Sequence, residues 1–174
     1  MKKNYFLFYL FLLSNCYSDY NPDLDYATIQ QLNRKMEQLY NDGHPAALAD
    51  FYQEDATIIG PDDELIGRDA IREYWQKMSY PVSLNIETLI MKENPDSIFQ
   101  TYKWQELKIS ISKSNRIKIR DAWDSGAAVF QLARIKTAYE REDVTVFTKE
   151  TTALLGWTKT DNGYFRMITT CFLD

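Results

Sequence analysis

The chain has 174 residues, of which 45% are hydrophobic and 14% aromatic, so it is long enough to bury the core of one compact domain. Its 20 Lys and Arg residues are outnumbered by 25 Asp and Glu residues, which argues against a basic nucleic-acid-binding surface. The single His leaves little material for metal sites built from several imidazoles. We therefore expect no nucleic-acid partner, no metal and no cofactor.

The first 15 residues have the features of an export signal. Two lysines precede an apolar run from Tyr5 to Leu13, which is too short to cross a bilayer as a helix. The sequence Leu-Ser-Asn-Cys that ends at Cys16 resembles the lipobox of bacterial lipoproteins, with an Asn where Gly or Ala is usual. That resemblance implies cleavage of residues 1–15, lipid attachment to Cys16, and anchoring in the bacterial cell envelope. The alternative is an ordinary signal peptide, with Cys16 left as a thiol.

Cleavage would leave an acidic protein without a disulfide framework. The signal carries two lysines and no acid, so the remaining chain has 18 basic and 25 acidic side chains, a formal charge of −7. The chain contains two cysteines, and a lipid on Cys16 would leave Cys171 without a partner. Residues 16–24 are polar, include a Pro and lack apolar periodicity, so we interpret them as a tether to a domain spanning residues 25–174.

Helical periodicity begins after the tether. A helical face is formed by apolar residues at spacings of three, four, three and one, namely Ile29, Leu32, Met36, Leu39 and Tyr40. Asn41-Asp42-Gly43 should end this helix, because Gly accepts the left-handed conformation of a helix C-terminus. His44-Pro45 then predicts a second, shorter helix through about Tyr52.

Five acids lie between Asp55 and Ile71, and most of them fit structural positions. The run 56–59 is β-prone and 60–63 is rich in turn formers. Gly67-Arg68-Asp69 leads into a third helix, in which Ile71, Tyr74, Trp75 and Met78 form the buried face. We therefore interpret Asp62, Asp63 and Asp69 as turn and helix-start residues.

Strands dominate the rest of the chain. Alternating apolar residues predict strands over 82–92 and around 107–111, and long strands over 122–136, 144–159 and 164–173. Thr160-Asp161-Asn162-Gly163 is a strong hairpin signal, because Asn-Gly tolerates positive φ. Residues 96–106 fit neither period. These elements predict an α+β domain with three N-terminal helices followed by an antiparallel sheet.

Three stretches carry a family resemblance: DFYQEDATII, the helix start Gly-Arg-Asp-Ala-Ile, and the closing GWTKTDNGYFRMI. With the order of elements from Asp25 to Asp174, they resemble the SnoaL-like group of the nuclear transport factor 2 superfamily. The resemblance implies a cone, in which a strongly bent antiparallel sheet wraps the first helix and leaves a pocket at its wide end. It also implies homodimers formed sheet to sheet.

The resemblance does not choose an activity, because the family includes isomerases, cyclases, dehydratases, hydrolases and binding domains. In the isomerases a general-base Asp precedes the Pro after the DAT strand, and here Gly60 takes that position. The first-helix Tyr that stabilises an oxyanion falls near Met36, which has no hydroxyl. His44 occupies a helix-start position, where a structural role is the simpler interpretation.

Candidate pocket residues are mostly aromatic. Rings with one polar edge suit a partly apolar ligand, and the possible wall residues are Tyr52, Trp75, Trp104, Trp123, Trp157 and Tyr164. Charges that could point into the cone from strands are Asp121, Asp124, Arg134 and Glu150. The competing interpretation of each ring is ordinary core packing, and the strand alternation cannot be phased from the sequence. A lone buried carboxylate would have a raised pKa and become an acid-base candidate.

Three functions therefore stay open. The first is a lipid-anchored module that binds an unidentified small, partly apolar molecule or a protein partner in its cone. The second is a cofactor-free isomerase, dehydratase or hydrolase. The third is a structural dimer with a filled cone. An open pocket with a desolvated carboxylate beside a Tyr or Arg would favour the enzyme, an open apolar pocket would favour the binding module, and a filled cone would favour the structural dimer.

Overall fold

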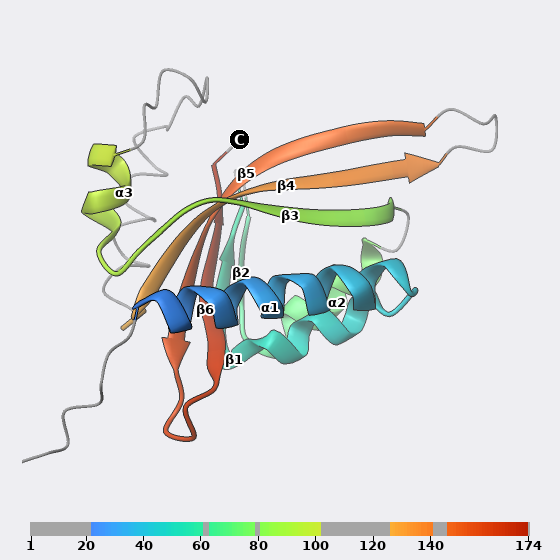
Figure 1. Cartoon of the computed structure of the whole chain (residues 1–174). Helices are drawn as coiled ribbons and strands as arrows, with labels where there is room; N and C mark the ends of the chain where they lie inside the picture. The colour runs from blue at the N-terminus through green and yellow to red at the C-terminus, as the bar shows by residue number, and fades with distance from the viewer. Residues whose placement is uncertain (1–21, 61–62, 79–80, 102–125, 141–145, 174) are drawn as a thin grey trace, which may run out of the picture.

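The computed structural model describes residues 22–60, 63–78, 81–101, 126–140 and 146–173 (Figure 1). In this part of the chain, most of the helices pack on one face of a strongly curved six-stranded sheet (Figure 1). We call the face covered by α1 (Pro22–Asn41), η1 (Pro45–Phe51) and α2 (Arg68–Lys77) the inner face, and the opposite side the outer face. The α+β class predicted from the sequence is confirmed.

The long first helix follows from its apolar spacing. Ile29, Met36 and Tyr40 are buried against the sheet, as predicted. The helix ends at Asn41, and Gly43 has a φ of 84° in the left-handed region that glycine favours. The helix begins at Pro22, three residues before the expected start at Asp25, since Pro is readily accepted in a first turn. None of the described helices is long and apolar enough to cross a membrane.

The second predicted helix is a short 3-10 helix, η1, that stops at Phe51. Tyr52 does not end it but begins the first strand, where it is opposite Met167 of the last strand. In α2 both Ile71 and Trp75 are buried, which confirms the predicted face of that helix. Asp69 lies in its first turn and accepts a hydrogen bond from Arg72 Nη1 at 2.7 Å.

The sheet has the strand order β2-β1-β6-β5-β4-β3. Its strands are β1 (Tyr52–Ile59), β2 (Glu64–Ile66), β3 (Pro81–Lys92), β4 (Val129–Glu140), β5 (Val146–Lys159) and β6 (Phe165–Phe172). We expected an antiparallel sheet, and every pairing is antiparallel except that of β1 with β6, which makes the sheet mixed. This parallel pair is possible because β1 and β6 are joined by a long connection rather than by a short hairpin turn.

Two irregularities help to bend the sheet. The β3–β4 register shifts between Thr88 and Ile90, and the β5–β6 register shifts between Gly156 and Trp157. A Cβ on Gly156 would lie 2.6 Å from Cγ2 of Thr169, so this close approach of β5 and β6 needs a residue without a side chain. Across the shift between Gly156 and Trp157, the residues of β6 that alternate onto the inner face change from one set to the other.

Both faces of the sheet carry an apolar cluster. The inner cluster joins the helices to residues such as Leu84, Val129, Ala133, Leu155 and Trp157. A smaller outer cluster contains Ile59, Ile98, Phe130, Leu132, Leu154, Cys171 and Leu173. Ile98 comes from α3 (Pro95–Thr101), which therefore covers part of the outer face. In Figure 1, α3 lies on the opposite side of the sheet from α1.

Several boundaries differ from the predicted ones. The first part of the ambiguous segment 96–106 lies in α3, which begins at Pro95. Asn94 precedes this helix, and its Oδ1 accepts a hydrogen bond from the backbone N–H of Asp96 at 2.8 Å. The strand expected over 122–136 runs from Val129 to Glu140 within the described residues, and β2 was not predicted because it spans only three residues. The strand expected around 107–111 lies outside the described residues.

Candidate functional site

A chain of neutral polar side chains crosses the interior of the cone. Asn33 extends from α1, Thr88 from β3, Gln131 from β4 and Trp157 from β5. Trp157 Nε1 donates a hydrogen bond to Gln131 Oε1 at 3.0 Å, and Gln131 Nε2 donates to Thr88 Oγ1 at 2.8 Å. Asn33 Nδ2 donates to the same hydroxyl at 3.5 Å. Four elements that are distant in sequence are thus joined by one network, buried at Trp157 and Gln131 and partly buried at Thr88, which we call the interior chain.

The indole sets the direction of the interior chain. An indole N–H can only donate, so Gln131 must accept with its oxygen and is left to donate with its nitrogen. Gln131 and Trp157 are fully buried, and Asn33 is 3% exposed. Asn33 Oδ1 is buried and has no hydrogen-bond partner. The described structure therefore leaves one acceptor of the interior chain unpaired, and an unpaired buried acceptor is unfavourable by about 1–3 kcal/mol.

A second buried hydrogen bond joins β1 to β6. Tyr52 Oη and Thr170 Oγ1 are 3.1 Å apart, and Tyr52 is 1% exposed. Burial raises the pKa of Tyr52 because it disfavours the phenolate, and the hydrogen bond to Thr170 offsets this effect only in part. Trp75 packs edge-on against Tyr40, and its buried indole N–H lies close enough to Tyr52 to lower that pKa but does not meet the geometry of a full hydrogen bond. These candidate wall residues lie within the packed inner cluster.

One carboxylate is among the buried polar residues that the structure describes. Asp25, in the first turn of α1, is 5% exposed, and its Oδ1 lies 3.1 Å from Lys159 Nζ. The same ammonium lies 5.5 Å from the centre of the Phe165 ring. Asp25 is therefore held in an ion pair that joins α1 to the β5–β6 hairpin. This pairing favours a structural role over proton transfer.

The candidate charges Arg134 and Glu150 lie on the outer face, away from the interior chain. Arg134 Nη1 is 3.3 Å from Glu87 Oε2, and Arg134 Nε is 3.7 Å from Glu150 Oε2. Lys136 Nζ lies 3.5 Å from the carboxylates of both Glu87 and Glu150. Two positive and two negative charges thus alternate across β3, β4 and β5, where solvent screens them.

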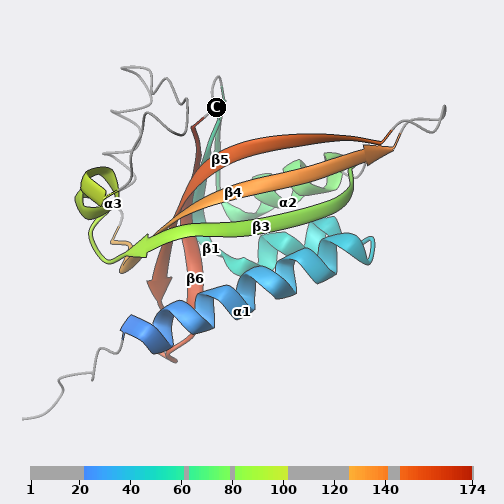
Figure 2. The same cartoon turned by 45° about the horizontal axis from the view of Figure 1, so that its top comes forward.

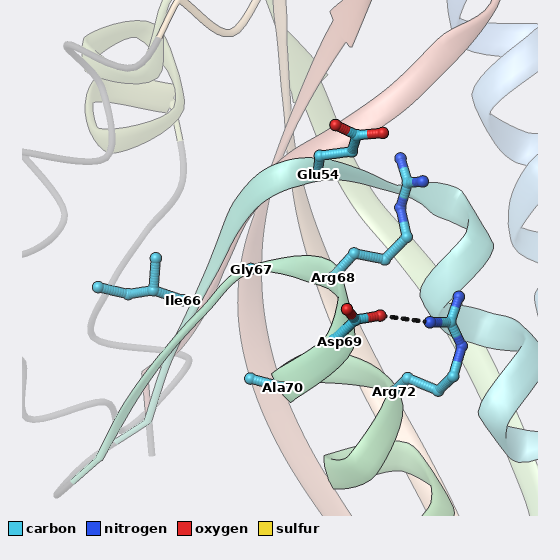
Figure 3. Close-up of a pocket in the computed structure, with 7 residues that line it drawn as sticks. All are labelled: Glu54, Ile66, Gly67, Arg68, Asp69, Ala70 and Arg72. Atoms are coloured by element: carbon cyan, nitrogen blue, oxygen red, sulfur yellow. Dashed lines mark hydrogen bonds and ion pairs between the residues drawn. The ribbon is translucent and has the colours of Figure 1, made fainter.

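A surface hollow of ≈ 490 Å³ lies beside the start of α2 (Figure 3). Its lining includes Glu54, Ile66, Gly67, Arg68 and Arg72. Figure 3 shows that the two arginines come from the first turns of α2. Arg68 Nε donates to the backbone carbonyl of Tyr52, and Arg72 pairs with two aspartates, so both guanidinium groups have structural partners.

The remaining predicted residues divide into three groups. Tyr164 is 70% exposed on the turn between β5 and β6, and therefore does not face the inner cluster. Gly60 donates its backbone N–H to Asp63 within the turn after β1, and Met36 is buried in the inner cluster. Outside the described residues lie Trp104, Trp123, Asp121 and Asp124. No cluster of three or more His, Cys, Asp or Glu suited to a metal ion occurs among the residues that the structure describes.

The sequence comparison places this geometry in a family. The profile of the SnoaL-like domain matches residues 33–134, more than half of the chain. The chain belongs to the SnoaL-like family. Among curated proteins, none matches the sequence. The matched range of this SnoaL-like protein contains three members of the interior chain, Asn33, Thr88 and Gln131.

Solved structures share the fold of this SnoaL-like protein at low sequence identity. The protein Aln2 from a Streptomyces species is 11% identical, with a TM-score of 0.58 over 88% of this chain and 91% of that one. A ketosteroid isomerase-like protein from Erwinia carotovora atroseptica is 13% identical, with a TM-score of 0.56 over 88% and 96%. An NTF-2 like protein of unknown function from Shewanella oneidensis is 15% identical, with a TM-score of 0.56 over 86% and 99%. At these identities the comparisons establish the fold alone.

The sequence analysis identified Trp157 but missed its three polar partners. Asn33 could have been found, since it lies on the apolar face of α1, four residues after Ile29 and three before Met36. A polar residue on such a face signals a buried hydrogen-bonding role. No comparable signal marks Thr88 or Gln131, because their strands contain other polar residues that face outward.

Proposed function

We propose that this SnoaL-like protein is a lipid-anchored module of the bacterial cell envelope that binds a small, partly apolar molecule in its cone. The interior chain orients one polar group of the ligand by hydrogen bonding. The aromatic and aliphatic residues of the inner cluster contact the apolar remainder. Binding of this kind requires no cofactor.

The unpaired Asn33 Oδ1 is the observation that carries this proposal. It is a buried acceptor at the end of a chain in which Trp157, Gln131 and Thr88 are hydrogen-bonded to one another, and a hydroxyl or N–H of a ligand would supply the missing donor. Amides, a hydroxyl and an indole also do not gain or lose protons near neutral pH. The interior chain therefore favours recognition of a neutral polar group over acid-base catalysis.

The enzyme alternative has weaker support in the described residues. Arg134 and Glu150 face outward, Asp25 is ion-paired, and Gly60 and Met36 carry no catalytic group. We expect the purified protein not to isomerise a steroid enone above background. Gly60→Asp alone should not introduce the activity, because a base without an oxyanion donor lacks much of the required transition-state stabilisation. Robust turnover by the unmodified protein would favour the enzyme.

Native mass spectrometry of the protein purified from its source cell tests binding directly. We expect an additional mass that is retained by the folded protein and lost on denaturation. Asn33→Leu should release this ligand while keeping or raising the thermal unfolding midpoint, because the variant removes an unpaired buried acceptor. Gln31→Leu, on an exposed position of the same helix, is the matched control and should retain the ligand.

Two results would contradict the proposal. One is a ligand-free wild-type protein, and the other is a ligand that Asn33→Leu binds unchanged. The measured subunit number would then bear on the structural alternative, a dimer formed through the outer face with a filled cone; the complete burial of Trp157 and Met167 favours the filled cone. On that outer face the alternating charges of Glu87, Arg134, Lys136 and Glu150 could complement those of a second copy.

The proposed lipid attachment and envelope localisation are tested separately through Cys16. Metabolic labelling with a fatty-acid analogue should tag the wild-type protein, and Cys16→Ser should abolish the tag and move the protein to the soluble envelope fraction. Stable anchoring would need two or more acyl chains. An untagged, soluble wild-type protein would show that the signal is of the ordinary secretory kind.

A further inference from the structure

Two exposed apolar side chains lie at one end of the domain. Leu24 in the first turn of α1 is 62% exposed, and Tyr164 on the β5–β6 turn is 70% exposed. In both views the start of α1 and the β5–β6 turn lie at the same end of the molecule (Figures 1 and 2). We call this region, formed by the first turn of α1 and residues 160–164, the tether end.

The ion pair between Asp25 and Lys159 holds the tether end together. Leu24 directly precedes Asp25, and Tyr164 directly precedes Phe165, whose ring lies beneath the Lys159 ammonium. The Lys159 side chain is 41% exposed while that of Asp25 is 7% exposed. The two apolar side chains therefore belong to one clamped surface, with a partly exposed ammonium between them.

The chain length before α1 limits where this surface can lie. Six residue steps separate Cys16 from Pro22, and a fully extended chain spans at most about 3.5 Å per step, or about 20 Å. If Cys16 carries the lipid, the start of α1 therefore remains close to the membrane surface whatever path those residues take. The opposite end of α1 is about 22 Å away along the helix and is not held by this limit, since 15 residues of helix separate Asp25 from Tyr40 and each adds about 1.5 Å.

We propose that the tether end rests on the phospholipid surface, with Leu24 and Tyr164 inserted at the level of the headgroups. This inference rests on the lipid anchor of the proposed function. Tyr suits that depth because its ring is apolar and its hydroxyl is polar, and Lys159 can extend its ammonium toward the lipid phosphates. The contact would orient the domain, while the lipid on Cys16 supplies the affinity.

Site-specific fluorescence on the lipidated full chain tests the contact. Asn162→Cys places a thiol on the exposed β5–β6 turn, and Gln76→Cys places one on an exposed position of α2. Gln76 lies at the end of the domain opposite the tether end. Met78, two residues after Gln76, accepts a hydrogen bond through its carbonyl from Tyr40, which lies near the end of α1. Cys171 is buried and Cys16 would be acylated, so an environment-sensitive maleimide should label the introduced thiol selectively.

The labelled proteins are reconstituted in phosphatidylcholine vesicles, whose zwitterionic surface avoids repulsion of the acidic domain. We expect a blue shift and quenching by headgroup-level nitroxide lipid for the label at residue 162, and neither change at residue 76. Combining Leu24→Ser with Tyr164→Ser should reduce both signals at residue 162. Ile66→Ser is the matched control. Ile66 is 68% exposed, but it lies on β2, which forms one edge of the sheet while β3 forms the other.

The outcomes separate this inference from the anchor itself. A fatty-acid tag with equal signals at residues 162 and 76, or signals unaffected by the double substitution, would overturn the tether-end contact and leave the anchor intact. A blue shift at residue 162 without quenching by nitroxide lipid, in a particle of two subunits, would mean that the tether end contacts a second copy. This result would also overturn the tether-end contact with lipid. An untagged protein would overturn both proposals. Unchanged thermal unfolding midpoints would show that the variants remain folded.

Discussion

The two faces of β4 carry polar side chains of different kinds. Gln131 points to the inner face and is fully buried, whereas Arg134, three residues later, lies on the outer face with 32% of its side chain exposed. The inner residue is neutral and hydrogen-bonded to Thr88 and Trp157. The outer residue is charged and paired with carboxylates on both neighbouring strands. On β4, therefore, the buried polar side chain is neutral and the charged side chain is exposed to solvent.

This difference has a functional consequence for the cone. A buried charge without full compensation is strongly unfavourable, whereas a neutral amide is accommodated by one or two hydrogen bonds. The interior chain can therefore remain in a dry interior and still offer a hydrogen-bonding group to a ligand. Charges on the outer face contribute to solubility and pairing with little effect on the cone.

The sharpest way to break the comparison is to place a charge on the inner face with Gln131→Glu. Burial should raise the pKa of the new carboxyl, and each unit between the ordinary value of about 4.3 and pH 7 is worth about 1.4 kcal/mol, so stability should fall by up to about 4 kcal/mol. Because the raised pKa belongs to the folded state, this loss should grow as the pH rises above about 4 and disappear below it. Urea unfolding between pH 4 and 7 measures it.

Gln76→Glu, the same change at an exposed position of α2, is the control for that experiment. It should change stability by no more than about 0.5 kcal/mol at any of these pH values. Equal pH dependence in both variants would mean that solvent reaches residue 131.

Removing one donor from the interior chain should have a smaller effect. Trp157→Phe keeps a ring in the inner cluster but deletes the N–H that Gln131 Oε1 accepts, so that oxygen becomes unpaired. We expect a loss of about 1–3 kcal/mol beyond that of the lost ring area, measured by chemical denaturation. Combining Trp157→Phe with Gln131→Leu should recover part of this loss, because both polar partners are then gone. Additive losses would show that the hydrogen bond contributes little.

The buried Tyr52 gives the inner face an alkaline pH dependence. Its pKa is raised in the folded state, so above a pH of about 10 the unfolded chain releases a proton that the folded chain retains, and stability should fall by about 1.4 kcal/mol per pH unit. Tyr52→Phe should remove this contribution. Tyr26 should preserve a smaller one, since burial and its hydrogen bond to Glu93 also raise its pKa but solvent screens this more exposed side chain. Unfolding curves collected between pH 9 and 11 for both proteins would test the difference, and identical slopes would contradict it.

On the outer face, Arg134→Gln should have the smallest effect. Its partners Glu87 and Glu150 are both partly exposed, and exposed pairs typically contribute about 0–1 kcal/mol. The effect should shrink further in high salt. A loss as large as that of Trp157→Phe would show that the outer charges are buried in the protein as it exists in solution, as a dimer through this face would require.

Local features of the fold were predictable from short stretches of sequence. The end of α1 at Asn41 and the turn before β6 depend on glycines at positive φ, Gly43 at 84° and Gly163 at 78°. The buried face of α2 follows from the spacing of Ile71 and Trp75. Each of these features is decided by a few consecutive residues, because backbone preference and helical periodicity act over one or two turns.

The candidate site was only partly predictable. Trp157 was identified as an inner residue, but whether Arg134 and Glu150 face inward depends on the phase of β4 and β5 in a sheet whose registers shift at several places. Sequence alternation does not show which set of residues meets the helices. The expectation that these charges could enter the cone therefore remained open until the strands were placed.

The sequence by itself determined the C-terminal end of α1, the β5–β6 turn and the number of apolar residues available for a core. The tertiary structure alone decided the parallel pairing of β1 with β6 and the joining of Asn33, Thr88, Gln131 and Trp157 in one chain. The physical reason is distance along the chain: a hydrogen bond between residues 26 positions apart, such as that from Trp157 to Gln131, depends on strand register rather than on its immediate neighbours. The polarity of the cone is consequently a property of the assembled sheet.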